Sequence, residues 1–426
     1  MKNIKQLLSA VILCLFLLPI QAQKFDGLAK TPPMGWNSWN KFACNVNETL
    51  IREVADAMVA SGMKDAGYEY IVIDDCWHGE RDSLGFITAH PEHFPSGIKA
   101  LSDYIHSKGL KFGIYSCAGD KTCGGKPASR GHEYQDALIY AKWGVDYLKY
   151  DWCNTDKLNA EGAYITMRDA LNSAGRPIVF SLCEWGTYKP WLWASQVGHL
   201  WRTTGDIFNC FDCVKDWGTW KSWGVMQILD MQEGLRQYAG PDHWNDPDMM
   251  EVGNGMSVNE DRAHFSMWCM LAAPLMCGND IQNMTIETLK ILTNKEMIAI
   301  DQDSLGIQGF RYEVKDSVET WLKPLKDDMW AVFYLNRSTT PKSFSVDWKT
   351  FYSMDTLSGR ILDTSGKDKY SVTMVVKGGK IEYIETKSRD IYKYMDIWNP
   401  KKTGETQKPL KVTIPGHDVL CLKLFK

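Results

Sequence analysis

The sequence has no apolar run long enough to cross a bilayer, no low-complexity tract and no short internal repeat. It also has no excess of positive charge, because 48 Lys and Arg residues stand against 52 Asp and Glu residues, for a net charge of −4. These absences argue against a membrane-spanning protein and against a nucleic-acid-binding protein. They leave a chain of 426 residues, long enough to bury large hydrophobic cores.

Metal and nucleotide sites are also poorly represented. Cys210-Phe-Asp-Cys213 has the spacing of half a zinc site, but no second Cys-x-x-Cys and no close His pair completes it. Asp246-Pro-Asp248 supplies fewer clustered oxygens than Ca²⁺ or Mg²⁺ requires. Gly124-Gly125 suits a tight turn rather than a phosphate-binding loop. We therefore expect no metal and no cofactor.

The N-terminus has the pattern of a secretory signal peptide over residues 1–22. Lys2 and Lys5 precede an apolar stretch from Leu7 to Leu18, and Ala22 precedes Gln23. Ile20, three positions before the cleavage point, is larger than the residue usually found there. The pattern predicts a secreted or periplasmic protein with no membrane span in its mature form.

Export changes the interpretation of the cysteines, because disulfides form in oxidising compartments. The chain has 12 cysteines, and removal of Cys14 leaves an odd number, so at least one thiol stays free or pairs between chains. Three cysteines lie in apolar runs and are expected to be buried thiols: Cys269, Cys277 and Cys421. The pairing of four others is left open: Cys117, Cys183, Cys210 and Cys213.

Eight strand-like runs, each ending in polar and aromatic residues, alternate with helical segments. The runs are Met34–Asn40, Tyr70–Trp77, Lys111–Cys117, Val145–Cys153, Ile178–Trp185, Leu200–Ile207, His243–Met249 and Leu271–Asp280. Leu50–Ala66 and Gly131–Trp143 show helical spacing between them. The pattern predicts an α/β fold, a (β/α)₈ TIM barrel over residues 23–307, with its chemistry at the C-terminal ends of the strands.

After residue 307 the helical segments give way to alternating strands separated by turn residues. The predicted strands are Glu319–Leu325, Met329–Leu335, Ser343–Trp348, Tyr370–Val376, Lys380–Glu385 and Leu410–Leu424. This pattern predicts a C-terminal antiparallel β-sandwich domain over residues 308–426. It has no clustered catalytic residues, so we expect a structural module packed on the barrel, or alternatively a sugar-binding accessory.

Two aspartates stand out because each follows a strand-like run and shares its face with a cation. Lys149 precedes Asp151 by two residues, and Arg202 precedes Asp206 by four. Paired carboxylates of this kind suggest glycoside hydrolysis. A single Asp after a strand is more often a helix cap or turn former, so neither residue alone is diagnostic.

Eight ordered motifs together give a more specific indication. They are Pro33–Trp39, Ile73–Cys76, Gly113–Tyr115, Lys121–Cys123, Lys149–Cys153, Cys183–Trp185, Arg202–Asp206 and Trp244–Met249. In this order they resemble glycoside hydrolase family 27, the α-galactosidases (melibiases) and α-N-acetylgalactosaminidases. The resemblance implies that Asp151 is the nucleophile and Asp206 the general acid/base. We expect Arg202 to point at the sugar rather than to pair tightly with Asp206, because such pairing would lower a pKa that an acid should keep raised.

The resemblance also implies a set of substrate-binding residues: Trp36, Asp74, Asp75, Tyr115, Lys149, Cys153, Glu184, Trp185, Arg202 and Met249. Asp74 and Asp75 would accept the galactose hydroxyls, and Trp36 and Trp185 would offer flat apolar faces. Glu184 with Trp185 would read the 2-position of the sugar. Without the resemblance, Asp74-Asp75 would be taken as a helix cap with a solvated acid, and the tryptophans as core residues.

The family pattern further implies two disulfides, Cys44–Cys76 and Cys123–Cys153. It also implies that Asp246 and Asp248 support the site rather than react with the substrate. The predicted function is an exported, retaining α-galactosidase acting on a galactose-containing oligosaccharide or polysaccharide. The alternatives are an α-N-acetylgalactosaminidase, a β-L-arabinopyranosidase or a non-catalytic galactoside-binding protein. The natural aglycone, the oligomeric state and glycosylation stay open.

Overall fold

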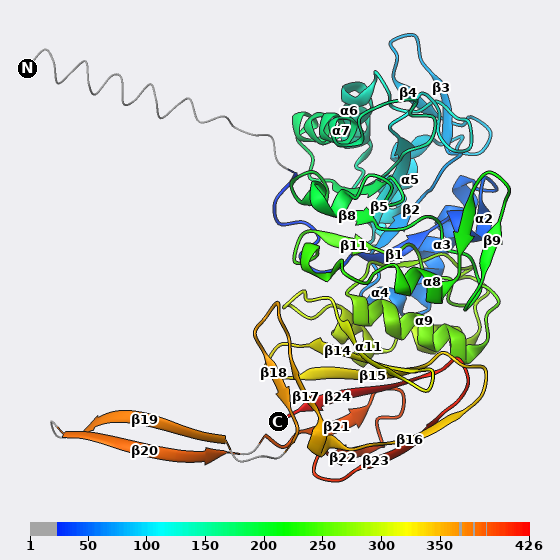
Figure 1. The fold of residues 1–426 in the computed structure, drawn as a ribbon. Helices are drawn as coiled ribbons and strands as arrows, with labels where there is room; N and C mark the ends of the chain where they lie inside the picture. Colours follow the sequence, from blue (N-terminus) through cyan, green and yellow to red (C-terminus); the bar gives the residue numbers. More distant parts are fainter. Residues whose placement is uncertain (1–23, 366–368, 378–379, 389) are drawn as a thin grey trace, which may run out of the picture.

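The computed structural model describes residues 24–365, 369–377, 380–388 and 390–426. The predicted signal peptide, residues 1–22, lies outside the described residues. A barrel of strands and helices forms one half of the molecule, and a mainly antiparallel β-structure forms the other (Figure 1). Within the described part of the chain, no helix is both long and apolar enough to cross a membrane.

The barrel contains eight parallel strands, one inside each of the eight predicted runs. In chain order they are β1 (Met34–Asn37), β2 (Tyr70–Val72), β5 (Lys111–Cys117), β6 (Tyr147–Asp151), β7 (Val179–Cys183), β8 (Leu200–Arg202), β11 (Trp244–Asp246) and β12 (Leu275–Cys277). From β1 to β11 each strand pairs in parallel with the next, and β12 pairs in parallel with β1. A parallel bridge between Met250, just after β11, and Cys277 joins the two remaining edges. The predicted (β/α)₈ barrel is confirmed.

The helices lie between the strands and cover the sheet. They are α2 (Trp39–Phe42), α3 (Glu48–Ala60), α4 (Met63–Ala66), α5 (Gly97–Ser107), α6 (Glu133–Trp143), α7 (Ala160–Ala174), α8 (Val225–Asp230), α9 (Val258–Leu271), α10 (Ile286–Leu292) and α11 (Lys295–Asp301). The predicted single helix Leu50–Ala66 is wrong in one respect, because Gly62, with a φ of 82°, separates α3 from α4.

Two short hairpins, neither of them predicted from the sequence, extend loops at the C-terminal ends of the barrel strands. One follows β2 and consists of β3 (His78–Arg81) and β4 (Ile87–Ala89). The other follows β8 and consists of β9 (Val214–Asp216) and β10 (Lys221–Trp223). Strands of three or four residues are too short to show a clear alternation in the sequence.

The C-terminal part is antiparallel, as predicted. Six strands form one sheet: β13 (Phe310–Lys315), β14 (Val318–Pro324), β15 (Trp330–Asn336), β24 (Val419–Phe425), β21 (Lys393–Asp396) and β22 (Thr403–Glu405). Three further antiparallel pairs of strands complete this part: β16 (Lys342–Val346) with β23 (Leu410–Ile414), β17 (Tyr352–Met354) with β18 (Ile361–Asp363), and β19 (Lys369–Lys377) with β20 (Lys380–Ser388). The predicted run Leu410–Leu424 is two strands, β23 and β24, separated by a turn.

The two parts pack together through α9 and α11. Arg262 on α9 pairs with Asp418 just before β24, with 2.8 Å between Arg262 Nε and Asp418 Oδ1. Buried Lys323 on β14 donates to the carbonyl oxygen of Cys269 on α9, at 2.8 Å. Trp321 and Phe333 of the sheet belong to the same hydrophobic cluster as the barrel. Figure 1 shows α9 between the barrel strands and the C-terminal sheet.

Both predicted disulfides are present, Cys44–Cys76 and Cys123–Cys153, with Cα separations of 5.2 and 5.1 Å. Cys210 and Cys213, whose pairing was open, form a third. The remaining cysteines of the described residues are buried thiols, as expected for the first three: Cys269, Cys277, Cys421, Cys117 and Cys183.

Candidate active site

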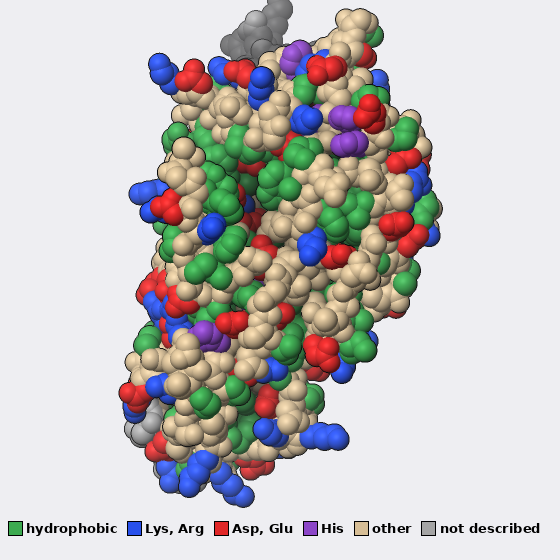
Figure 2. Space-filling model, turned by 90° about the vertical axis from the view of Figure 1, so that its right-hand side faces the viewer, with side chains coloured by type: hydrophobic (Ala, Val, Ile, Leu, Met, Phe, Trp, Pro, Cys, Tyr) green, Lys and Arg blue, Asp and Glu red, His purple; other side chains and the backbone are tan. Residues whose placement is uncertain are grey.

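A cavity of about 660 Å³ opens at the C-terminal ends of the barrel strands. It is lined by Trp39, Asn40, Asp74, Asp75, Tyr115, Cys123, Lys149, Asp151, Cys153, Trp185, Thr187, Arg202, Gly205, Asp206, Trp220, Lys221, Trp223, Asp248 and Met249. Figure 2 shows a hollow on this side of the molecule, with acidic side chains inside it and hydrophobic side chains around it. A cavity of this size, apolar at the rim and charged inside, suits a small polar ligand such as a sugar.

Asp151 ends β6 and lies in the cavity with only 6% of its surface exposed. Its Oδ1 accepts a hydrogen bond from the backbone N–H of Trp152, at 2.8 Å. Burial raises the pKa of Asp151 to about 7, the charge of Lys149 opposes that rise, and Asp206 adds to it. The carboxyl group is thus poised between its two protonation states near neutral pH.

Lys149 lies two residues before Asp151 on the same face of β6, as the period of a strand requires. Its Nζ lies 2.8 Å from Oδ2 of Asp74, which also accepts from Nδ2 of Asn37 at 2.7 Å. Burial, the largest single effect, lowers the pKa of Lys149, but the neighbouring groups, with Asp74 first among them, together raise it well above its ordinary value. Lys149 therefore stays charged and holds the buried Asp74 carboxylate in place.

Asp75 is fixed by backbone donors rather than by a cation. The N–H of Cys76 donates to Oδ1 and the N–H of Gly124 donates to Oδ2, both at 2.6 Å. A Cβ at position 124 would lie 2.9 Å from the sulfur of Cys76, so this close approach requires glycine. The disulfide Cys123–Cys153 anchors the same loop beside Asp151, and Tyr115 Oη lies 3.2 Å from the Cys123 sulfur.

Arg202, at the end of β8, joins two carboxylates of the cavity. Its Nη2 lies 3.1 Å from Oδ1 of Asp206 and 2.7 Å from Oδ2 of Asp248. The expectation that Arg202 would not pair with Asp206 is therefore wrong. Arg202 is 3% exposed, and a guanidinium taken out of water needs anionic partners, which these two groups supply. Asp206 itself is 41% exposed and lies at the open side of the cavity.

Asp246, the last residue of β11, and Asp248, two residues further on, hold this arrangement. Oδ1 of Asp246 accepts from the N–H of Asp248 at 2.9 Å, and Oδ2 of Asp248 accepts from the N–H of Ile207 at 2.8 Å. Burial raises the pKa of Asp248 to about 6, and Arg202 opposes the rise. Asp248 thus connects Arg202 to the segment that carries Asp206.

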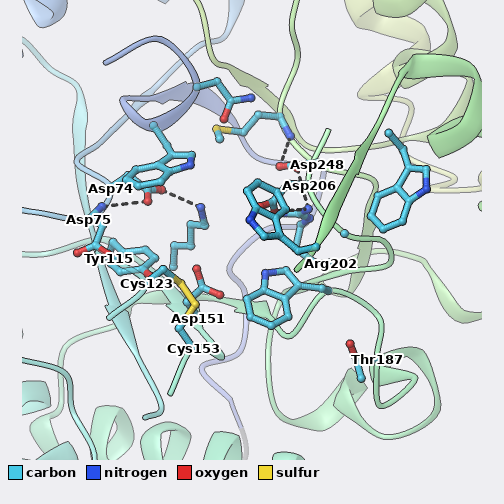
Figure 3. A pocket seen from close by; sticks show the side chains of 18 of the residues that line it. Asp74, Asp75, Tyr115, Cys123, Asp151, Cys153, Thr187, Arg202, Asp206 and Asp248 are labelled. Carbon is cyan, nitrogen blue, oxygen red and sulfur yellow. Dashed lines mark hydrogen bonds and ion pairs between the residues drawn. A yellow bond between two sulfur atoms is a disulfide. The ribbon is translucent and has the colours of Figure 1, made fainter. Parts of the chain in front are cut away.

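Most of the predicted residues line the one cavity: Asp74, Asp75, Tyr115, Lys149, Asp151, Cys153, Trp185, Arg202, Asp206 and Met249. Figure 3 shows Asp74, Asp75 and Tyr115 on one side of it, Arg202, Asp206 and Asp248 on the other, and Asp151 between them. These residues come from loops more than a hundred positions apart in the chain.

Two expected sugar contacts fall outside the cavity. Trp36 is fully buried, and its indole N–H donates to the carbonyl oxygen of Asn279 at 2.7 Å. Glu184 is fully buried as well, and its Oε2 accepts from the N–H of Tyr188 at 2.6 Å. Trp39, three residues after Trp36, lines the cavity instead, because the chain turns into α2 after β1.

Several residues line the cavity that were not predicted from the sequence: Trp39, Asn40, Thr187, Gly205, Trp220, Lys221 and Trp223. The last three belong to or adjoin the β9–β10 hairpin. The only signal in the sequence was the density of tryptophan between Trp217 and Trp223, which is unusual for a polar loop.

The ligand atoms of Cys123, Asp151 and Cys153 lie within 4.8 Å of one another. The two sulfurs are bonded to each other, so they cannot act as thiolate ligands, and one carboxylate does not make a metal site. What the cavity offers chemically is a buried carboxyl group and an exposed one, with polar groups between them. On a (β/α)₈ barrel, this arrangement defines the class of glycoside hydrolases.

The comparisons with known proteins specify the family. Residues 31–303 match the family described as "Alpha galactosidase A", and residues 315–424 match the "Alpha galactosidase C-terminal beta sandwich domain". The chain therefore belongs to the α-galactosidase family, family 27 of the glycoside hydrolases.

Individual relatives are similar to this protein in sequence or structure over nearly the whole chain. The chain is 53% identical to the α-galactosidase A of Cellvibrio japonicus, over 99% of both chains. The crystal structure of α-galactosidase I from Mortierella vinacea is 37% identical, with a TM-score of 0.82 over 94% of this chain and 98% of that one. The Saccharomyces cerevisiae α-galactosidase with raffinose is 30% identical, with a TM-score of 0.82 over 95% and 99%.

Proposed function

We propose that the protein is an exported, retaining α-galactosidase that removes terminal non-reducing α-D-galactosyl residues. The observation that supports this most directly is the meeting of Asp151 and Asp206 in one cavity, with Asp74, Asp75 and Lys149 beside them. The relatives named above are α-galactosidases, and one was solved with raffinose, a galactoside.

In the first step, a carboxylate oxygen of Asp151 attacks the anomeric carbon. The bond from that carbon to the glycosidic oxygen breaks, and the oxygen takes a proton from Asp206, so the product is a galactosyl ester of Asp151 and a free aglycone. In the second step, Asp206 accepts a proton from water, which attacks the anomeric carbon and releases Asp151. Two inversions give net retention of the α-configuration.

The two carboxyl groups are suited to these roles by their positions. Asp151 is buried in the cavity, and Lys149 favours its ionised form. Asp206 is exposed toward the opening, through which the leaving group departs. Its pairing with Arg202 must loosen before it can hold a proton, and Asp248 remains as the partner of Arg202.

The galactose hydroxyls would be bound on the opposite side of the cavity. Asp74 and Asp75 are acceptors held rigidly by Lys149 and by backbone N–H groups. Trp185 supplies a flat apolar face, and Met249 fills the wall. Glu184 is fully buried, so it acts on the 2-position of the sugar only through the loop that carries Trp185.

The reaction is tested by proton NMR of purified mature protein with a nitrophenyl α-galactoside. We expect the α-anomer of galactose to form first, and first appearance of the β-anomer would contradict the assignment of Asp151. Asp151→Asn should abolish turnover on every substrate. The matching α-N-acetylgalactosaminide and β-L-arabinopyranoside test the alternative activities, and binding without turnover would favour the galactoside-binding alternative.

We further propose cleavage after residue 22, a catalytic barrel over residues 23–307 and a structural sandwich over residues 308–426. The pattern of charged, apolar and small residues at the N-terminus supports export. N-terminal sequencing of protein recovered from the periplasm or medium tests this, and recovery of the intact chain only in the cytoplasm would exclude it.

A further inference from the structure

The β9–β10 hairpin carries two tryptophans that are unusually open to solvent. Trp217 is 46% exposed and Trp220 is 49% exposed, and among the described side chains no other tryptophan is exposed to this degree. Their rings stack with centroids 5.4 Å apart and an interplanar angle of 19°. Trp220 lines the cavity and Trp217 does not. Exposed aromatic area at the rim of a cavity commonly marks a binding surface.

The hairpin holds Trp220 in a fixed position. The N–H of Trp217 donates to the carbonyl oxygen of Trp220 at 3.0 Å, and the indole N–H of Trp217 donates to Oγ of Ser222 at 3.1 Å. Lys215 lies over the Trp217 ring, with Nζ 4.9 Å from its centroid. The disulfide Cys210–Cys213 precedes β9 directly. Two hydrogen bonds and the contact with Lys215 thus hold Trp217 in place, and its ring packs against that of Trp220.

The hairpin is also joined to the segment that carries Asp206. The N–H of Trp223 donates to the carbonyl oxygen of Asp206 at 3.1 Å, and the N–H of Phe208 donates to that of Trp223 at 2.8 Å. A Cβ at position 205 would lie 2.2 Å from the Trp223 ring, so Gly205 permits this contact. Trp220 therefore belongs to the Asp206 side of the cavity, opposite Asp74 and Asp75.

We infer that Trp220 forms the subsite for the aglycone, and that the group it binds is a pyranose sugar. The inference rests on the proposed function: the group that protonates the leaving oxygen must adjoin the leaving sugar, so the aglycone lies on the Asp206 side. The indole face of Trp220 matches the apolar C–H face of a pyranose ring. Lys221, which also lines the cavity, can donate to a sugar hydroxyl.

The test compares two substrates with the same galactosyl group, melibiose, whose aglycone is glucose, and α-galactosyl fluoride, whose leaving group has no ring. In Trp220→Ala, the ratio of kcat/KM on melibiose to kcat/KM on the fluoride should fall about ten-fold, because only melibiose loses a stacking partner. Trp220→Phe should keep most of the ratio. Tyr352→Ala, a change of another exposed aromatic residue, on β17, is the matched control and should not change it.

A ratio that is unchanged in Trp220→Ala, which includes equal losses on both substrates, would overturn the aglycone subsite. If the alanine variant does not fold, the same ratio is measured in Trp220→Leu, because leucine keeps apolar bulk without an aromatic face. Failure of the wild type to hydrolyse α-galactosyl fluoride would instead contradict the proposed function, so the two failures are distinguishable.

Discussion

Asp151 and Asp206 are the same residue type in opposite surroundings, one 6% exposed and the other with a side chain 41% exposed. Burial, more than any neighbouring charge, sets the behaviour of Asp151, and Lys149 is the main group that opposes it. At the residue scale, the chemistry therefore depends on how deeply each carboxyl group lies, which can be probed by pH and by leaving group.

The first prediction concerns pH. In the proposed mechanism Asp151 must be ionised to attack, and burial raises its pKa to about 7, so kcat/KM should fall as pH decreases through the pKa of the free enzyme. Lys149→Met removes the cation that lowers this pKa, so the acid limb should move to higher pH, whatever the loss in maximal rate. Lys149→Arg keeps the charge and serves as control. An acid limb at the same pH in Lys149→Met would show that Asp151 does not control it.

The second prediction concerns the leaving group. Asp206→Ala removes the proposed proton donor, so hydrolysis of methyl α-galactoside, whose leaving oxygen needs protonation, should fall about a hundred-fold or more. Hydrolysis of a dinitrophenyl α-galactoside, which leaves readily as an anion, should fall much less in its first step. Pre-steady-state release of dinitrophenol measures that step directly. Equal losses on both substrates would argue against Asp206 as the acid.

At the scale of elements, loops fixed by disulfides and backbone hydrogen bonds carry the site. Cys123–Cys153 joins the loops after β5 and β6, and Cys210–Cys213 precedes the β9–β10 hairpin. The two bridges differ in sequence separation, 30 residues against 3, so they constrain the unfolded chain to different extents.

The third prediction follows from that difference. Replacing Cys123 and Cys153 together by Ser should lower the free energy of unfolding by about 3–4 kcal/mol if chain entropy dominates. The same change at Cys210 and Cys213 should lower it by about half as much. Denaturant titration of both double variants measures this. The Cys123 and Cys153 variant should also lose activity, because Gly124 then holds Asp75 less firmly. A larger loss of stability from the shorter bridge would contradict the chain-entropy account.

At the scale of the whole molecule, the barrel and the C-terminal sheet share a buried interface with charges in it. Asp301 on α11 is fully buried, and its pKa is raised to about 8 by burial, with Lys323 opposing the rise. Lys323 comes from β14, so the two parts of the molecule supply one group each.

The fourth prediction concerns stability against pH. A carboxyl group with a raised pKa binds its proton more tightly in the folded state, so its contribution is present at low pH and is lost as pH rises through about 8. Burial lowers the pKa values of His78 and His264 to about 3, so these two groups make stability rise with pH. They do so only below 6.5, the pKa of histidine in the unfolded chain. Stability should therefore fall between pH 6.5 and about 8.5.

Asp301→Asn should reduce that fall, and Asp103→Asn, at an exposed position paired with Lys99, should not. Thermal unfolding at several pH values compares the three proteins. A wild type whose stability rises over this window, or an Asp301→Asn variant with an unchanged slope, would contradict the assignment.

Much of the architecture followed from the sequence. All eight barrel strands lie within the predicted runs, and β5 coincides with Lys111–Cys117. The predicted antiparallel segments and two disulfides are also present. These features could be predicted because the alternation of side chains along a strand is local, and because the order of the motifs resembles a known family.

What the sequence by itself determined was the fold class, the family and the pair of aspartates at the ends of two barrel strands. Only the tertiary structure decided that Trp39 rather than Trp36 reaches the cavity, that Glu184 is buried, that Arg202 pairs with Asp206 and Asp248, and that Trp220 closes one wall. The reason is physical: these outcomes depend on contacts between loops far apart in the chain. Local spacing fixes the face of a strand from which a side chain leaves, but not the partner that it meets.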